Sequence, residues 1–247
     1  MDKLLYLSMT GATQTMLAQT AHANNLANAT TTGFKSDLAQ ARAMPVVGDG
    51  YQSRVYAMTE RPATDMSAGV NQHTGRDLDV AVQDDGWIAV QAQDGKEAYT
   101  RAGELQVDIN GMLRTGRGLP VIGEGGPILL PPSGKVDIGA DGTITVQVLG
   151  DGADTLSVVD RIKLVDPTAR DLTKGLDGLM RLKSGEQAAI DPLVRLQSGH
   201  VETSNVNAVG ELTAMIDLSR RFEMNIKMMK NAEENAAAAA KIMQNLG

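Results

Sequence analysis

The chain has 247 residues and a formal net charge of −7, with one Trp, four Tyr and two Phe. An acidic chain with so few aromatic residues lacks the basic, base-stacking surface of a general nucleic-acid-binding protein, so we expect no nucleic-acid partner. The absence of cysteine excludes disulfides, thiolate nucleophiles and sulfur metal sites.

Apolar side chains near the N-terminus recur at alternating steps of four and three residues. Between Leu5 and Leu26 this spacing places them on one side of a helix, with a polar break at Gln19. We expect this helix to run from residue 1 to about 30, where a Thr-rich stretch and Gly33 end the pattern. The apolar run after Lys3 is too short for a secretory signal, and no stretch approaches the roughly 20 apolar residues of a membrane span.

The middle of the chain changes to a period of two. Runs such as 78–82, 88–90, 105–109 and 144–148 alternate in polarity. Asp94-Gly95, Asn110-Gly111 and Asp141-Gly142 predict two-residue hairpin turns between strands. We therefore predict an antiparallel β domain, barrel or sandwich-like, over residues 75–198, preceded by a polar connector over residues 36–74.

A second stripe of helical spacing runs from Leu212 to Met243, with polar breaks at Ser219 and Glu233. We expect a long helix that begins after residues 205–207, with Ser204 or Asn205 as its N-cap. The N-terminal segment 1–35 and the C-terminal segment 199–247 are expected to pair as a coiled coil; the alternative is two ordinary surface helices on one core.

The side chains expected to form an assembly interface are those of the two stripes. They are Leu5, Met9, Ala12, Met16, Ala23 and Leu26 in the first helix, and Leu212, Met215, Phe222, Ile226, Met229, Ala236, Ala240 and Met243 in the second.

Motifs for catalysis, metals and cofactors fail on spacing. The run from Asp137 to Asp141 resembles a calcium loop, but Gly139 stands at a ligand position and Val148 where a closing Glu is needed. His22, His73 and His200 have no second ligand at helical spacing. We expect no cofactor and no enzymatic activity. An enzyme that acts on the cell wall, which would need paired carboxylates in a cleft, is the competing class.

Three segments carry a family resemblance that covers nearly the whole chain. Residues 24–35 (NNLANATTTGFK) resemble the N-terminal signature of the flagellar axial proteins, the rod, hook and hook-associated proteins of bacteria. Residues 204–223 are similar to the C-terminal signature of that family, and residues 75–81 with 99–103 look like its central β domain. The motif residues are Asn24, Asn25, Leu26, Ala27, Asn28, Gly33, Phe34, Ser204, Asn205 and Val206.

The resemblance implies a structural subunit that transmits torque. Such a chain would pass unfolded through the flagellar type III export apparatus and assemble with itself and other rod proteins into a helical tube in the basal body, across the periplasm and without membrane insertion. Residues 1–6 and Trp87-Ile88 look most like a proximal-rod subunit; the distal-rod paralogue, which typically has a Phe pair at that place, and the hook protein are the alternatives.

Three hypotheses follow from this resemblance. The terminal helices would be poorly ordered in the free chain and fold against neighbouring subunits. The motif asparagines would either cap their own helix or bind the backbone of a neighbour. Phe34, one of two Phe residues, would anchor the connector in a pocket.

Overall fold

The computed structural model describes residues 3–45, 55–148 and 156–245. Met1 and Asp2, which contribute to the resemblance to a proximal-rod subunit, lie outside these ranges. The chain divides into two units. We call residues 1–29, 36–65 and 206–247 the helical unit, and residues 30–35 and 66–205 the β unit.

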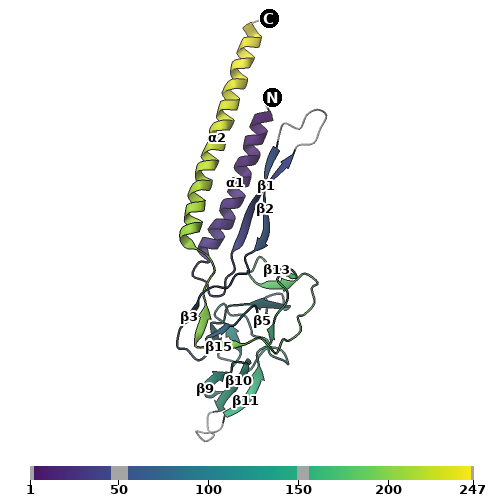
Figure 1. Cartoon of the computed structure of the whole chain (residues 1–247), viewed down its shortest axis with the longest axis vertical. Coiled ribbons are helices and arrows are strands. Elements are labelled where there is room, and N and C mark those ends of the chain that lie inside the picture. Colours follow the sequence, from purple (N-terminus) through teal and green to yellow (C-terminus); the bar gives the residue numbers. More distant parts are fainter. Residues whose placement is uncertain (1–2, 46–54, 149–155, 246–247) are drawn as a thin grey trace. The chain divides into compact units, whose positions relative to one another are not determined.

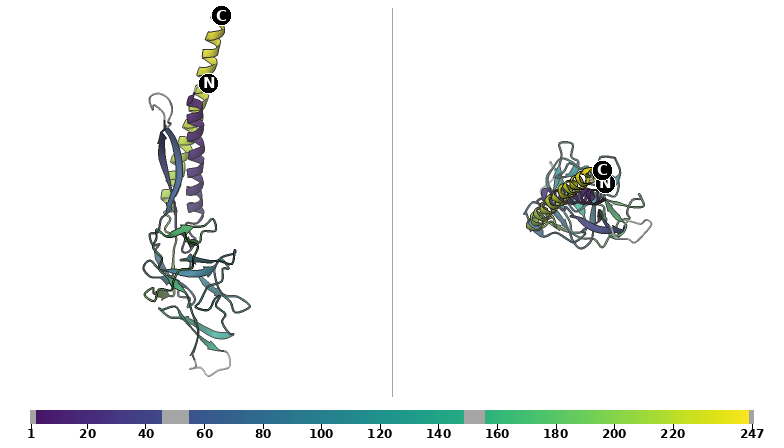
Figure 2. Two further views of the ribbon diagram at one scale, coloured as in Figure 1. Left: turned by 90° about the vertical axis from the view of Figure 1, so that its right-hand side faces the viewer. Right: turned by 90° about the horizontal axis from the view of Figure 1, so that it is seen from above.

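Two antiparallel helices, α1 (Lys3–Ala27) and α2 (Ala208–Asn245), lie side by side in the helical unit (Figures 1 and 2). At 38 residues, α2 is about 57 Å long at 1.5 Å per residue. Its N-cap is Asn207, whose Oδ1 accepts the Gly210 N–H at 3.1 Å, so the expected caps Ser204 and Asn205 were wrong. Neither helix is long and apolar enough to cross a membrane.

A hairpin of β1 (Asp37–Pro45) and β2 (Val55–Thr64) packs on α1 within the same unit. The sequence predicted only a connector here. In β1 the residues that alternate with larger side chains are Ala39, Ala41 and Ala43. Alanine favours helix over strand, which is why this period of two was missed.

The β unit contains several small antiparallel sheets. One has five strands in the order β12-β5-β6-β14-β13, one has three in the order β11-β10-β9, and three are pairs: β15-β4, β16-β3 and β7-β8. Their bounds are β3 Asn71–His73, β4 Val80–Val82, β5 Trp87–Gln91, β6 Glu97–Thr100, β7 Leu105–Val107, β8 Leu113–Thr115, β9 Ser133–Ile138, β10 Thr143–Val148, β11 Leu156–Arg161, β12 Leu164–Val165, β13 Leu172–Lys174, β14 Met180–Leu182, β15 Leu196–Ser198 and β16 His200–Glu202.

The mainly β character of this region is confirmed, but the expected barrel is wrong for the described residues. The strand orders are linear, so no sheet of the described residues closes on itself. The pairs β4–β15 and β3–β16 join strands that are more than 100 residues apart in the chain. Alternation of polarity identifies strands but does not select such distant partners, so it cannot distinguish a closed sheet from several small open ones.

The five-stranded sheet buries side chains on both faces. In β5, Ile88 and Val90 belong to a large core, while Trp87 and Ala89 belong to a smaller one with Tyr99. Successive side chains of a strand point to opposite faces, so a fully buried strand serves two cores. The three-stranded sheet contributes Ile138, Ile144 and Val146 to the large core.

The predicted turns are in place, but their type differs from the prediction. At each one the chain closes a three-residue loop: the amides of Ala92, Asp108 and Gly139 donate to the carbonyls of Lys96, Met112 and Thr143. Gly95, Gly111 and Gly142 are left-handed, with φ of 76°, 80° and 86°, whereas the preceding Asp or Asn is not. A type I turn followed by a left-handed Gly explains this, since a two-residue type I′ turn needs positive φ at both positions.

Gly103 allows a close approach of two backbones in the β unit. A Cβ at this position would lie 1.6 Å from the carbonyl oxygen of Val80. We expect Gly103→Ala to lower the free energy of unfolding of the β unit by about 1–3 kcal/mol or more, because the backbone must move. Urea unfolding followed by the fluorescence of Trp87, the single Trp, measures this. Gly134→Ala is the control, because nothing lies within 4 Å of its added Cβ. Equal stability of the two variants would contradict the steric argument.

Candidate assembly surface and its supports

The side chains that α1 buries against α2 and the β1–β2 hairpin are mostly small or polar. On α1, the buried residues Ser8, Ala12, Thr15 and Ala18 follow helical spacing. A Cβ at Gly11 would lie 3.1 Å from Oδ1 of Asn225, which shows how closely α2 approaches. Small side chains allow this short separation, and the larger Met9 and Met16 lie at the border of the buried face, three and four residues from Ala12.

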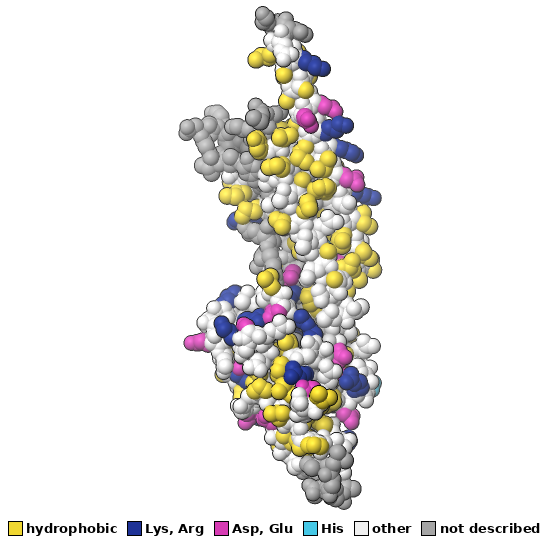
Figure 3. Space-filling view, turned by 180° about the vertical axis from the view of Figure 1, so that it is seen from behind, with side chains coloured by type: hydrophobic (Ala, Val, Ile, Leu, Met, Phe, Trp, Pro, Cys, Tyr) yellow, Lys and Arg dark blue, Asp and Glu magenta, His cyan; other side chains and the backbone are white. Residues whose placement is uncertain are grey.

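Large apolar side chains consequently remain exposed on both helices. Met9 and Met16 on α1 are 49% and 56% exposed, and Leu212 and Ile226 on α2 are 49% and 43% exposed. Figure 3 shows apolar side chains gathered along the helices on the face that it displays. We call the exposed large apolar residues of α1 and α2 the helical apolar surface: Leu4, Tyr6, Met9, Met16, Leu17, Val209, Leu212, Ile216, Met224, Ile226, Met228, Ile242 and Met243. Exposed apolar areas of this kind mark sites of protein association.

The structure distributes the residues of the two predicted stripes over different environments. Ala12 is buried; Leu5, Leu26, Met215, Phe222 and Met229 are half-buried; Met9, Met16, Ala23, Leu212, Ile226, Ala236, Ala240 and Met243 are exposed. A contact between subunits is not present in a single chain, so their role in assembly stays a prediction.

A polar cluster joins α1, α2 and β1 in the helical unit. Asn25, which is 1% exposed, donates to the Asp37 carbonyl and accepts the Asp37 N–H, both at 2.9 Å. Its Nδ2 also lies 3.2 Å from Oε1 of Glu211, and Nδ1 of His22 bonds to the other oxygen of that carboxylate. Glu211 lies in the first turn of α2, where a negative charge is favourable. The cluster therefore fixes the register of three elements.

The other motif asparagines have different environments. Asn28 donates through Nδ2 to the carbonyl of Asn24 at 2.9 Å, within the last turn of α1. Asn24 is exposed, as is Ala27. The sequence left two roles open for these asparagines: capping their own helix or binding the backbone of a neighbouring subunit. The contacts that Asn25 and Asn28 make in this structure lie within their own chain.

Gly33 and Phe34 connect the first segment of the β unit, residues 30–35, to the rest of that unit. Gly33 has φ of 65°, and its Cβ would lie 2.3 Å from the backbone nitrogen of Ala102, so only glycine fits. Phe34 is half-buried, and the ammonium group of Lys174 lies 3.9 Å from the centroid of its ring. The Phe34 carbonyl accepts the Asn205 N–H at 3.3 Å, which joins the two signature motifs.

The C-terminal signature begins with three half-buried residues, Ser204, Asn205 and Val206. Asn205 donates through Nδ2 to the carbonyl of Ser67 at 3.2 Å, and the Ser204 carbonyl accepts the Thr203 hydroxyl at 3.5 Å. Asn205 therefore donates hydrogen bonds to two other segments of the β unit, at Phe34 and at Ser67.

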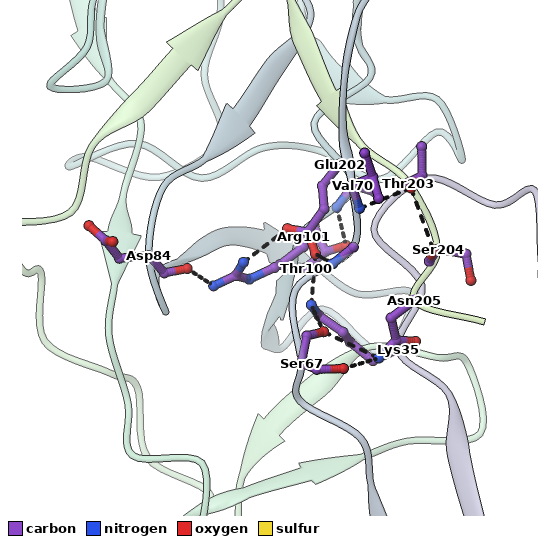
Figure 4. Close-up of polar contacts among 12 residues, drawn as sticks. Lys35, Ser67, Val70, Asp84, Thr100, Arg101, Glu202, Thr203, Ser204 and Asn205 are labelled. Carbon is purple, nitrogen blue, oxygen red and sulfur yellow. Dashed lines mark hydrogen bonds and ion pairs between the residues drawn. The ribbon is translucent and has the colours of Figure 1, made fainter. Parts of the chain in front are cut away.

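A buried ionic cluster in the β unit centres on Glu202, which is 1% exposed (Figure 4). Its Oε1 accepts from Lys35 Nζ at 2.7 Å and from the Gly69 N–H at 2.8 Å, and its Oε2 accepts from Arg101 at 2.9 Å. Burial alone would raise the pKa of Glu202, but the hydrogen bonds from Lys35 and Gly69 and the charge of Arg101 outweigh it and hold the pKa below its usual range.

Arg101 connects this cluster to the smaller core. Its guanidinium bonds to the Asp84 carbonyl and lies 5.4 Å from the centroid of the Trp87 ring. Asp84 has φ of 52°, a left-handed conformation that costs energy in a residue other than glycine. The bond from Arg101 helps to hold this residue in place.

Three residues of the ionic cluster are close in sequence to points where the chain enters or leaves the β unit: Lys35 precedes 35/36, Gly69 follows 65/66, and Glu202 precedes 205/206. Lys35 bonds to Glu202 and to the Ser67 carbonyl, Gly69 bonds to the Glu202 carboxylate, and Gly33 donates to the Glu202 carbonyl. Segments that are distant in sequence therefore meet at one carboxylate inside the β unit. Sequence reasoning missed Lys35, Arg101 and Glu202, although all three lie within or beside the signature segments.

The sequence prediction found no site for catalysis, and the described residues contain no group of three or more His, Asp or Glu arranged around a metal position. A cavity of about 430 Å³ lies beside Trp87, Arg101, Asp85 and Asp166. Both of its carboxylates are exposed, and its Arg101 is already bonded to Glu202. This environment differs from the buried, paired acids of a glycosidase.

The comparisons with known proteins agree with the three segments above. Residues 5–35 match the family model of flagella basal body rod proteins, residues 81–146 match the D1 domain of the flagellar hook protein FlgE/F/G, and residues 197–242 match the C-terminal part of the flagellar basal body rod FlgEFG proteins. The chain is 44% identical to the flagellar basal-body rod protein FlgF of Escherichia coli K12, over 98% of this chain and 99% of the relative. This chain belongs to the flagellar basal-body rod protein family.

Within the rod family it is most like FlgF. The Salmonella typhimurium FlgF is 43% identical over 98% of this chain and 99% of the relative. The flagellar basal-body rod protein FlgG of Buchnera aphidicola subsp. Schizaphis graminum is 32% identical, over 93% of this chain and 95% of the relative. The helical signatures of the rod family thus coincide with the helices, the Asn25 cluster and the segments that meet at Glu202.

We expect Glu202→Gln to destabilise the β unit by about 3–5 kcal/mol, because it leaves Lys35 and Arg101 buried without a countercharge. Urea unfolding followed by Trp87 fluorescence measures this. Glu104→Gln is the control, since Glu104 is an exposed carboxylate of the same unit. A loss no larger than in the control would show that the cluster contributes little.

The same cluster predicts an acid dependence. Because the pKa of Glu202 is lowered on folding from an ordinary value of 4.5, its contribution is complete above that value and is lost as the pH falls through the folded-state pKa. The stability of the wild type should therefore fall on acidification more steeply than that of Glu202→Gln. Parallel profiles would contradict this.

Asn25→Ala should lower the free energy of unfolding of the helical unit by about 1–3 kcal/mol, because it removes the hydrogen-bond partner of the Asp37 backbone and of Glu211. Circular dichroism at 222 nm during thermal unfolding follows the helices, while Trp87 reports on the β unit. The exposed neighbour Asn24→Ala is the control. The idea fails if both variants lose helix at the same temperature as the wild type.

Proposed function

We propose that this chain is a structural subunit of the proximal rod of the bacterial flagellum. It assembles with itself and with other axial proteins into the helical tube that transmits torque. The observation that carries this proposal is the helical apolar surface. Both helices leave large apolar side chains in water, although each has a packed face within its own chain.

The different burial of small and large side chains on α1 supports an assembly role. Ala12 and Ala18 serve the contact inside the chain, where small size permits close approach. Met9 and Met16 stay outside, and an unbranched thioether adapts to neighbours that are not quite equivalent. Heterologous contacts that do not close into a ring then extend into a tube.

We further propose that neighbouring subunits cover this surface by coiled-coil packing of α1 and α2. The assembly segments in this proposal are residues 1–35 and 199–247, with the β domain of residues 75–198 between them and the segment 36–74 as the connection. The resemblance to rod proteins supports delivery through the type III export apparatus and a location in the part of the basal body that spans the periplasm. The chain is a structural protein rather than an enzyme, as its FlgF relatives are.

Ile226→Glu tests the proposal, because it places a charge on the helical apolar surface at a residue that is 43% exposed and whose loss should leave the chain folded. We expect loss of swimming and loss of the protein from purified basal bodies when the variant replaces the natural chain in its own host. Lys227→Glu, at the exposed neighbouring position, makes a larger change in charge and should swim normally. Normal motility of Ile226→Glu would count decisively against assembly through this face.

A further inference from the structure

His73 and His200 face each other across β3 and β16 in the β unit, with ring centroids 4.8 Å apart. The backbone explains this proximity. The Thr74 N–H donates to the Gly199 carbonyl at 2.8 Å, and the Thr203 N–H donates to the Val70 carbonyl at 2.9 Å. These bonds identify 74/199 and 70/203 as hydrogen-bonded pairs of the ladder. Pairs alternate along an antiparallel ladder, so His73 and His200 occupy a non-hydrogen-bonded pair, where side chains lie closest.

The ring of His200 is oriented for binding through one nitrogen. Its Nδ1 lies 3.0 Å from the Ser198 carbonyl oxygen, which only accepts, so in the neutral ring Nδ1 carries the proton and Nε2 the lone pair. Histidines that bind metals are commonly held in this way by a backbone carbonyl on the other nitrogen. No hydrogen bond occupies the ring of His73 in the described part of the chain, and this residue is exposed.

Gln197 supplies a third polar group. Its Nε2 lies 3.4 Å from Nε2 of His200. Rotating the terminal amide by half a turn, which exchanges two atoms of nearly equal size, points Oε1 toward the same nitrogen. A cation between the two rings would then have an amide oxygen within reach.

We propose that His73 and His200, with Gln197, bind one divalent transition-metal ion such as Zn²⁺ or Cu²⁺. Imidazole nitrogen suits these metals, whereas Mg²⁺ and Ca²⁺ require sites built from oxygen ligands. Metal–nitrogen bonds of about 2.0–2.1 Å are compatible with the observed ring separation after small side-chain rotations. The remaining coordination positions face solvent and take water or a group from a neighbouring molecule.

Such an ion would link β3 directly to β16, the strand that ends at Glu202. Metal that binds the folded chain and not the unfolded one stabilises the folded chain by mass action. The ion would therefore add a second connection between β3 and β16, besides their backbone ladder.

Isothermal titration of the full-length chain with Zn²⁺ alone tests the proposal. We expect saturable binding of one equivalent, weakened at least tenfold in both His73→Ala and His200→Ala, and a smaller loss in Gln197→Ala. Gln72→Ala should bind as the wild type does, because Gln72 is exposed on the same strand and its side chain points to the opposite face. Zn²⁺ should also raise the urea midpoint of Trp87 fluorescence in the wild type and not in the two His variants.

Absence of saturable binding up to millimolar Zn²⁺ would overturn the proposal. So would undiminished affinity in both His variants, which would place the ion elsewhere, for example at His22 and Glu211. An unchanged circular dichroism spectrum without metal excludes misfolding of the His variants as the cause of a lost site.

Discussion

The arrangement of the signature segments in the β unit depends on one buried carboxylate, that of Glu202. Glu202 accepts hydrogen bonds from Lys35, Gly69 and Arg101. Lys35, Gly69 and Glu202 each lie within four residues of a point where the chain passes into the helical unit. A buried ion pair is a poor source of net stability, because the cost of desolvation offsets most of the attraction. Its effect is specificity: two buried cations tolerate only the arrangement that brings this carboxylate to them. The folded chain therefore has one way to gather these segments.

In the helical unit, the size of a side chain on α1 is related to whether it is buried within the chain or exposed. Small residues such as Ala12 and Ala18 face inward, and large ones such as Met9 and Met16 face outward. Close packing within the chain and an apolar surface toward neighbours are therefore properties of adjoining faces of one helix, since Met9 and Met16 lie three and four residues from Ala12. The polar cluster of His22, Asn25 and Glu211 sets the register, because its hydrogen bonds have fixed geometry whereas apolar contacts slide. This division suits a subunit that must fold as one chain and then join many.

Different parts of the fold were predictable to different degrees. Periodicity located both helices and the strands β4, β5, β7 and β10 of the β unit, and Gly95, Gly111 and Gly142 marked the turns. The hairpin β1–β2 was missed because alanine carries a weak strand signal. The motif of residues 24–35 identified the family, but the charged residue that ends it, Lys35, was not recognised as half of a buried pair.

The sequence by itself determined the two helices, the positions of several turns, the family and the apolar character of the helices, because each depends on residues that are close together in the chain. Only the tertiary structure decided which face of each helix is covered, that His22 meets Glu211, and that Lys35 and Arg101 share Glu202. These contacts join residues from 101 to 189 positions apart. Spacing along the chain carries no information about such pairs, and the two helical stripes therefore indicated that partners exist without showing which side chains meet them.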